Sequence, residues 1–120
     1  MSPWFITGFC DAESSFSLKI QKSLKYKIGY KIQPIFTIEL NQRDLILLEE
    51  IKTFFGIGLV KVNNIKNTVT YSITKLNDLV TIIIPHFKNY PLFTQKSIDF
   101  SLWCNIISII ENGEHLTKEG

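Results

Sequence analysis

Hydrophobic and polar positions divide the chain into helical and extended segments. From Pro3 to about Asp11, apolar residues lie on almost every side of a helix, which predicts a helix that is buried all round. Ser2 suits the N-cap of this helix, and proline suits its first turn. From Ser15 to Gln21, apolar and polar residues alternate strictly, which predicts a strand with one buried face. The chain therefore changes from helix to strand over a few residues.

The same order of elements then continues along the chain. Residues 30–40 alternate again, although Pro34 interrupts them and indicates an edge strand or a bulge. Asn41 is the expected cap of a second helix, which ends at Gly56. Two further alternating segments flank residues 63–67, and this arrangement predicts a β-hairpin.

Two helices complete the predicted fold. Helical spacing of apolar residues covers residues 76–87 and then about 94–112. Together the elements predict an α+β fold of order αββαββα(α), in which helices back one four-stranded antiparallel sheet. We expect residues 1–120 to form a single domain, whose last residues, 112–120, are linker-like.

The outward positions of the predicted strands carry Ser, Thr, Asn, Gln and Lys side chains. These residue types contact phosphates and base edges, although an ordinary solvated sheet face has a similar composition. Charge favours a polyanion, because residues 14–38 and 52–77 hold nine of the thirteen basic residues and no acidic residue, while the rest of the chain has a net charge of −7. We therefore expect a polyanion to contact these outward positions, which are Ser15, Ser17, Lys19, Gln21, Ser23, Lys25, Lys27, Lys31, Gln33, Thr37, Lys61, Asn63, Lys66, Thr70, Ser72 and Thr74.

Other classes of protein and site are disfavoured by composition. The apolar runs are too short to span a bilayer, so we expect no membrane partner, and no cleavable leader is visible. Cys10 and Cys104 lie in apolar helical patterns and are expected to be buried free thiols. His86 and His115 have no partners at metal-ligand spacing, which predicts surface or packing roles.

Two acids, Asp11 and Glu13, lie where the first helix gives way to the first strand. A helix C-terminus carries partial negative charge, so a carboxylate there is destabilised unless a cation joins it. If two such helix ends met at a two-fold axis, their carboxylates would form a site for hard divalent ions. Glu13 could equally be a solvated acid at the end of a helix.

The residues around these acids resemble a known family. The stretch "ITGFCDAES", from Ile6 to Ser14, resembles the nine-residue signature of the LAGLIDADG homing endonucleases. The longer stretch "PWFITGFCDAESSF" is especially similar to the fungal mitochondrial, intron-encoded branch, and so are "NQRDLILLEEI", "YPLFTQKSIDF" and "ENGEHLTKEG". The resemblance implies that two signature helices pack together and that each delivers one acid to a cleavage centre. It also implies a mitochondrial location, which a lysine-, isoleucine- and asparagine-rich composition suits.

The resemblance implies roles for individual residues. Glu13 is the expected metal-binding and catalytic acid, with Ala12 beside it at the metal site, and Asp11 is the second, largely structural acid. Lys96 matches a basic residue beside the active site, and is the other expected catalytic residue. The implied metal is Mg²⁺ or Mn²⁺, whereas Ca²⁺ would occupy the site without supporting cleavage. The implied dimer interface consists of Trp4, Phe5, Gly8 and Ala12.

The chain carries one signature, which leaves two assemblies open. It would act either as a homodimer or with a missing C-terminal half. The function implied is that of a site-specific homing endonuclease half, which binds a long duplex DNA site and cleaves both strands as a homodimer by metal-dependent phosphodiester hydrolysis. The polyanion expected at the outward positions of the sheet, from Ser15 to Thr74 as named above, would then be this DNA. The alternatives are an isolated DNA-binding half-domain without cleavage activity and an RNA-binding intron maturase.

Overall fold

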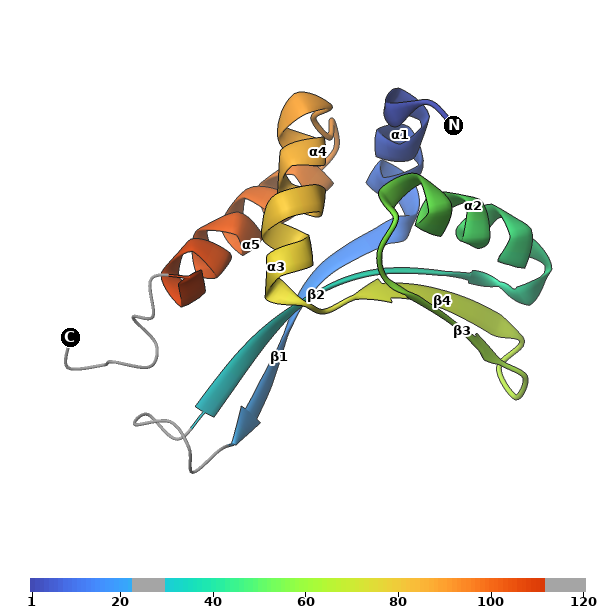
Figure 1. Ribbon diagram of the computed structural model, residues 1–120, viewed down its shortest axis with the longest axis horizontal. Helices are drawn as coiled ribbons and strands as arrows, with labels where there is room; N and C mark the ends of the chain where they lie inside the picture. Colours follow the sequence, from blue (N-terminus) through green and yellow to red (C-terminus); the bar gives the residue numbers. More distant parts are fainter. Residues whose placement is uncertain (23–29, 112–120) are drawn as a thin grey trace.

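In the described part of the chain, all helices lie on one face of a curved antiparallel sheet, and none of them covers the opposite face (Figure 1). The computed structural model describes residues 1–22 and 30–111. Its elements are α1 (Pro3–Glu13), β1 (Ser14–Lys22), β2 (Tyr30–Asn41), the 3₁₀ turn η1 (Gln42–Asp44), α2 (Leu45–Phe55), β3 (Leu59–Asn63), β4 (Thr68–Ile73), α3 (Leu76–Asp78), the π-helical turn η2 (Leu79–Ile83), α4 (Ile84–Asn89) and α5 (Lys96–Glu111). The predicted α+β order is confirmed, including the additional helix.

The strand order is β1-β2-β4-β3, with every neighbouring pair antiparallel. β2 pairs with β1 from Tyr30 to Ile38, but with β4 only from Phe36 onward. Pro34 therefore lies in the part of β2 that has a partner on one side only, which is where a residue without an N–H is tolerated. The sequence prediction of an edge position was correct, and the register with β1 runs on without a bulge.

α1 begins as predicted but has one open face. The Ser2 hydroxyl accepts a hydrogen bond from the Trp4 amide at 3.2 Å, and proline follows the cap. The helix ends two residues later than expected, at Glu13, where the Ser14 hydroxyl donates to the Cys10 carbonyl at 2.8 Å. Ile6 and Cys10 are fully buried, whereas Phe5 is 48% exposed. The prediction of a helix buried all round was therefore wrong for this chain by itself.

An aromatic cluster joins the sheet to the helices that cover it. The ring of Phe16 on β1 lies 5.0 Å from Trp103 and 5.3 Å from Phe100 on α5, and 5.7 Å from Phe87 on α4. The Trp103 indole also donates to the Ser17 carbonyl at 2.9 Å. Burial of these rings, each worth a few kcal/mol, fixes α4 and α5 against β1.

The helices of the C-terminal half differ in detail from the prediction. The helix expected over residues 76–87 is one helical path that changes from α to π and back, in α3, η2 and α4. α5 starts at Lys96, two residues later than predicted, because Asp11 binds the chain just before it. Within the described part of the chain, no helix is long and apolar enough to cross a membrane.

His86 on α4 lies inside the protein, so a surface role is wrong and a packing role is correct; His115 lies outside the described residues. The Thr7 hydroxyl donates to the Tyr90 carbonyl at 2.7 Å, so at the 3.2 Å contact between Thr7 and His86 the imidazole Nε2–H is the donor. The rings of Phe54, Phe55 and Phe87 surround the imidazole. Burial lowers the pKa of His86 to about 4.

This burial predicts acid-sensitive stability. Above the ordinary histidine pKa of 6.5 both states are neutral, and the full stability is present. As the pH falls from 6.5 towards 4, His86 becomes protonated in the unfolded chain but stays neutral in the folded protein. The free energy of unfolding should therefore drop by roughly 3 kcal/mol. Denaturant unfolding between pH 7.5 and 4 measures this drop. His86→Gln should flatten that part of the profile, and an unchanged slope in this variant would contradict the assignment.

Candidate functional site

Glu13 is the last residue of α1, and its side chain is exposed. β1 begins at the next residue, so the carboxylate lies where the helix layer meets the edge of the sheet. It lines a hollow of about 640 Å³, together with Phe9 of α1, Glu39 of β2 and Asp44 at the start of α2. The partial negative charge at the helix end adds to that of the carboxylate. A cation or a proton donor is therefore favoured at this position.

Asp11, two residues before Glu13, has its carboxylate fully occupied by the segment before α5. One oxygen accepts from the Phe93 amide at 2.8 Å, and the other accepts from the Thr94 amide at 3.2 Å and the Thr94 hydroxyl at 2.8 Å. Burial alone would raise the pKa of Asp11, but these hydrogen bonds and the charge of Lys96 together lower it. This geometry supports the structural role expected for Asp11.

Lys96 contacts the backbone immediately after Glu13, and its catalytic role stays a prediction. Its ammonium group donates to the Ser14 carbonyl at 2.6 Å, on the residue that follows Glu13. Its own backbone amide donates to the Thr94 hydroxyl at 3.2 Å, and Thr94 is the residue that Asp11 holds. The hydrogen bonds of Asp11 and Thr94 thus connect the start of α5 to the end of α1 and place the Lys96 ammonium against the backbone of the residue after Glu13.

The donor set at the end of α1 fits half of a divalent-metal site. The carboxylate of Glu13 and the carbonyl of Ala12 are oxygen donors, the type that Mg²⁺ and Mn²⁺ bind, and a carbonyl in the last turn of a helix has no intrahelical partner. Among residues 1–22 and 30–111, no three His, Cys, Asp or Glu side chains are grouped to hold a metal by themselves.

The cross-strand register confirms which side chains share the uncovered face of the sheet. Ser15 lies opposite Thr37, and Thr37 lies opposite Ser72. Lys19 likewise pairs with Gln33 on the same face. These positions alternate along the strands with the core residues Phe36, Ile38 and Ile73, so their side chains point away from the helices. The strands run across the lower part of Figure 1, below the helices. The other predicted contacts that the structure places on this face, or next to it in the β3–β4 turn and after β4, are Ser17, Lys61, Asn63, Lys66, Thr70 and Thr74.

Some of the predicted DNA contacts cannot be placed by their side chains. Ser23, Lys25 and Lys27 lie outside the described residues. For Gln21 and Lys31 the structure gives the backbone register, in which they are paired across β1 and β2. As DNA contacts, these five positions and those placed on the face above all remain predictions.

One acidic residue on this face, Glu39, was absent from the predicted set. Thr70 lies opposite Glu39 on one side and opposite Lys61 on the other, so all three side chains belong to the same row. The sequence contained the signal, because strict alternation already put Glu39 on the outward face.

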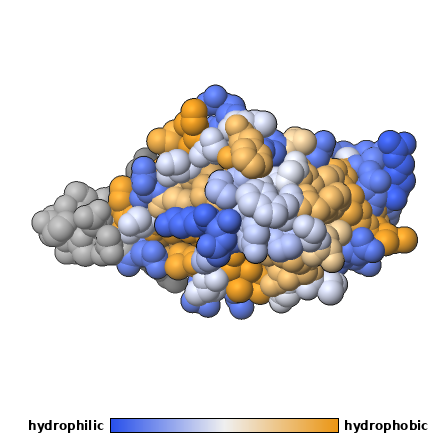
Figure 2. All heavy atoms as spheres, turned by 90° about the horizontal axis from the view of Figure 1, so that it is seen from above, coloured by the Kyte–Doolittle hydropathy of each residue, from blue (hydrophilic) through white to orange (hydrophobic). Residues whose placement is uncertain are grey.

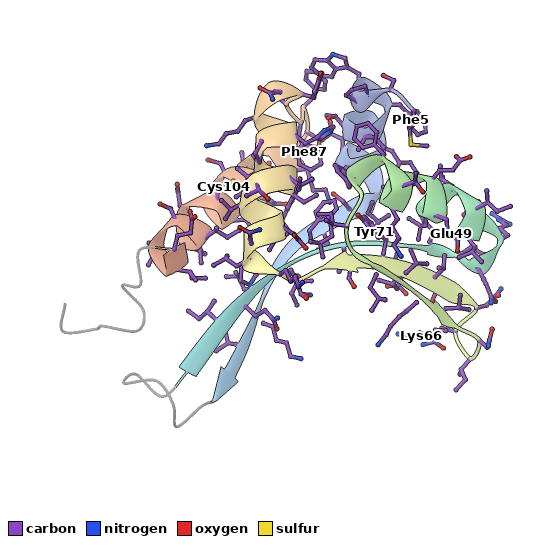
Figure 3. All side chains as sticks on the ribbon, viewed as in Figure 1. Phe5, Glu49, Lys66, Tyr71, Phe87 and Cys104 are labelled. Carbon is purple, nitrogen blue, oxygen red and sulfur yellow. The ribbon has the colours of Figure 1, made fainter. Side chains whose placement is uncertain are left out.

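The open face of α1 presents the residues expected at a dimer interface. Phe5 is 48% exposed and stacks on Phe9, and a Cβ added at Gly8 would have no atom within 4 Å. Trp4 is partly covered by its own chain, because its ring contacts Tyr90 at 5.2 Å and Phe93 at 6.0 Å. Figure 2 shows apolar surface in the half of the molecule where Figure 1 places α1 and α2, and Figure 3 shows Phe5 at the side of α1. An apolar face around a small residue is suited to close helix packing.

Comparison with known proteins gives a consistent result. A family model described as LAGLIDADG endonuclease matches residues 6–107. A probable intron-encoded endonuclease of Neurospora crassa, endonuclease 2, is 41% identical over 121 residues, which cover 100% of this chain and 27% of that protein. The chain thus spans about a quarter of the length of this curated relative.

Two solved structures illustrate how such a fold is used in proteins of different lengths. I-SmaMI, bound to an uncleaved DNA target in the presence of calcium ions, is 38% identical with a TM-score of 0.93, over 99% of this chain and 40% of that chain. The homing endonuclease I-TnaI is 34% identical with a TM-score of 0.93, over 99% of this chain and 80% of that chain. Proteins with this fold therefore include chains about as long as this one and chains more than twice as long.

Proposed function

Because the chain belongs to the LAGLIDADG endonuclease family, we propose that it is the DNA-binding and catalytic half of a site-specific homing endonuclease. The observation that carries this proposal is the position of Glu13, an exposed acid at the end of α1 where the helix meets the uncovered polar face of the sheet. A duplex lying on that face would bring its phosphates to this acid. The proposed reaction is hydrolysis of one phosphodiester bond in each strand.

The roles of the side chains follow from their positions. Glu13 and the Ala12 carbonyl would hold Mg²⁺ or Mn²⁺, which supplies an activated water and stabilises the phosphoryl oxygens when bound. Lys96, with its ammonium group fixed against the Ser14 carbonyl, would stabilise negative charge that develops on the phosphate. Asp11 and Thr94 would hold Lys96 in place. Ca²⁺ would support binding with little cutting, because its coordination is looser.

A second helix end completes the proposed site. Either a second copy of this chain or a C-terminal half would supply it, and both arrangements pair the open face of α1 with an equivalent helix. The longer intron-encoded relatives support the second arrangement, and their fungal origin supports a mitochondrial location.

Cleavage of duplex DNA is the direct test of the function. A library of near-palindromic sites would be incubated with the protein and Mg²⁺, then with Ca²⁺, then with chelator, and cut ends would be sequenced. We expect cutting with Mg²⁺ only. Specific binding without cutting would instead identify an isolated DNA-binding half-domain, and preference for structured intron RNA would identify a maturase.

Binding through the sheet face predicts a position-dependent effect of lysine removal. Lys61→Ala should weaken binding to all DNA sequences alike and reduce the salt slope of log Kd by about one, because one phosphate contact is lost. Lys88→Ala removes the same charge from an exposed position on α4, in the helix layer, and should leave the slope unchanged. Titrations between 50 and 200 mM salt measure both slopes. Equal slopes for the two variants would exclude the sheet face as the electrostatic contact.

A further inference from the structure

Glu39 is unusual among the residues of the sheet. It is the only acidic residue in β1, β2, β3 and β4 as the structure bounds them. Its side chain is exposed on the uncovered face, in the row that also contains Thr70 and Lys61. Strand pairing holds its backbone firmly, because the residues on either side, Ile38 and Leu40, pair with β4 and turn towards the core.

An acid on a DNA-binding face is costly unless it meets a hydrogen-bond donor. Phosphates repel it, so it weakens binding to every sequence by the same electrostatic effect. In the major groove, the exocyclic amino group of cytosine can donate a hydrogen bond to a carboxylate. Guanine and thymine instead present acceptor oxygens there, which repel a carboxylate. Attraction to cytosine and repulsion from guanine and thymine both increase the difference in affinity between these bases.

The position of Glu39 relative to Glu13 indicates where that base lies. Both carboxylates line the hollow of about 640 Å³ at the end of α1. The register of β1 with β2 pairs Ser14 with Ile38, so continuing it by one step brings position 13 level with Glu39. A base contacted by Glu39 would therefore lie close to the cleaved phosphate rather than at the outer end of the site.

A second role for Glu39, as a metal ligand beside Glu13, is less consistent with the geometry. In the part of the chain that the structure describes, no three acidic, histidine or cysteine side chains are arranged around a common point. An ion pair with Lys61 is also disfavoured, because Thr70 lies between the two residues in the row.

From these observations, and resting on the DNA-binding function proposed above, we propose that Glu39 is a specificity-determining residue that selects a base pair with an exposed amino group, cytosine above all, next to the cleavage point. Glu39→Gln is the sharpest test, because an amide keeps the shape, loses the charge and prefers adenine over cytosine. Glu49→Gln is the matched control, since it removes the same charge from an exposed position on α2, in the helix layer (Figure 3).

The experiment is binding of the wild type and both variants to a duplex library in Ca²⁺, followed by sequencing of the bound fraction. For Glu39→Gln we expect about a tenfold loss of preference for cytosine at one position at the inner end of each half-site, next to the cleaved phosphate, with other positions unchanged. The Glu49→Gln profile should equal that of the wild type. If Glu39→Gln binds all sequences more tightly but keeps the wild-type profile, the base-reading role is wrong and the DNA-binding function stands. If the wild type itself shows no sequence preference, both proposals fail.

Discussion

Replacing Glu13 by glutamine is expected to abolish DNA cleavage while DNA binding is retained. The amide keeps the size and hydrogen-bonding capacity of the side chain but removes the charge that holds a divalent cation at the end of α1. A homodimer carries the change twice, so both central carboxylates are lost and cutting should fall below detection. Binding should be equal or tighter, because two acids no longer repel the phosphates. The cleavage and binding assays described above measure both quantities on one target.

The control for this variant is Glu50→Gln, which makes the same chemical change at an exposed position on α2 and should leave cutting intact. Glu13 is exposed, so the variant should also fold as the wild type does, and its unfolding midpoint verifies this. Robust cutting by the Glu13→Gln protein, or by the wild type in chelator, would remove Glu13 and the metal from the mechanism.

Periodicity alone was sufficient to predict the order of elements. The strict alternation of β1 and β4 put Phe16, Tyr71 and Ile73 on the inner face, and the structure places them in or against the core. Local signals also located the boundaries that depend on local chemistry, such as the Ser2 cap and the end of α2 at Gly56, whose φ of 76° lies in the left-handed region.

Such local patterns do not predict contacts between residues that are far apart in the sequence. The start of α5 was predicted two residues early because nothing in the local sequence shows that Asp11, more than 80 residues away, binds the Phe93 and Thr94 amides. For the same reason the sequence left a surface role and a packing role open for His86, since its aromatic surroundings come from α2 and α4 together. The uniformly apolar sequence of α1 likewise did not distinguish burial in the chain's own core from burial against a partner.

For the candidate site, the sequence identified the residues but not the contacts between them. Family resemblance identified Glu13 and Lys96, but only the structure shows that the Lys96 ammonium binds the carbonyl of the residue after Glu13. Glu39 was overlooked because the outward face was read for positive charge and hydrogen-bonding groups, and a lone acid did not fit that criterion. A single acid on a face of basic and polar residues is thus as informative about function as the basic residues themselves.

The open face of α1 predicts that Gly8→Leu converts a dimer into a folded monomer. A Cβ at Gly8 meets no atom of its own chain within 4 Å, so the substitution should not lower the stability of the monomer, and loss of a helical glycine should raise it by up to about 1 kcal/mol. Between two copies, however, the added side chain would separate helices that must approach closely to bring both Glu13 carboxylates together. Sedimentation at micromolar concentration should show a dimer for the wild type and a monomer for the variant, and cutting should fall with the loss of the dimer. Asn105→Leu adds the same side chain to an exposed position on α5 and should remain dimeric and active. A stable wild-type monomer would exclude the homodimer, and an unaffected Gly8→Leu dimer would show that the subunits meet elsewhere.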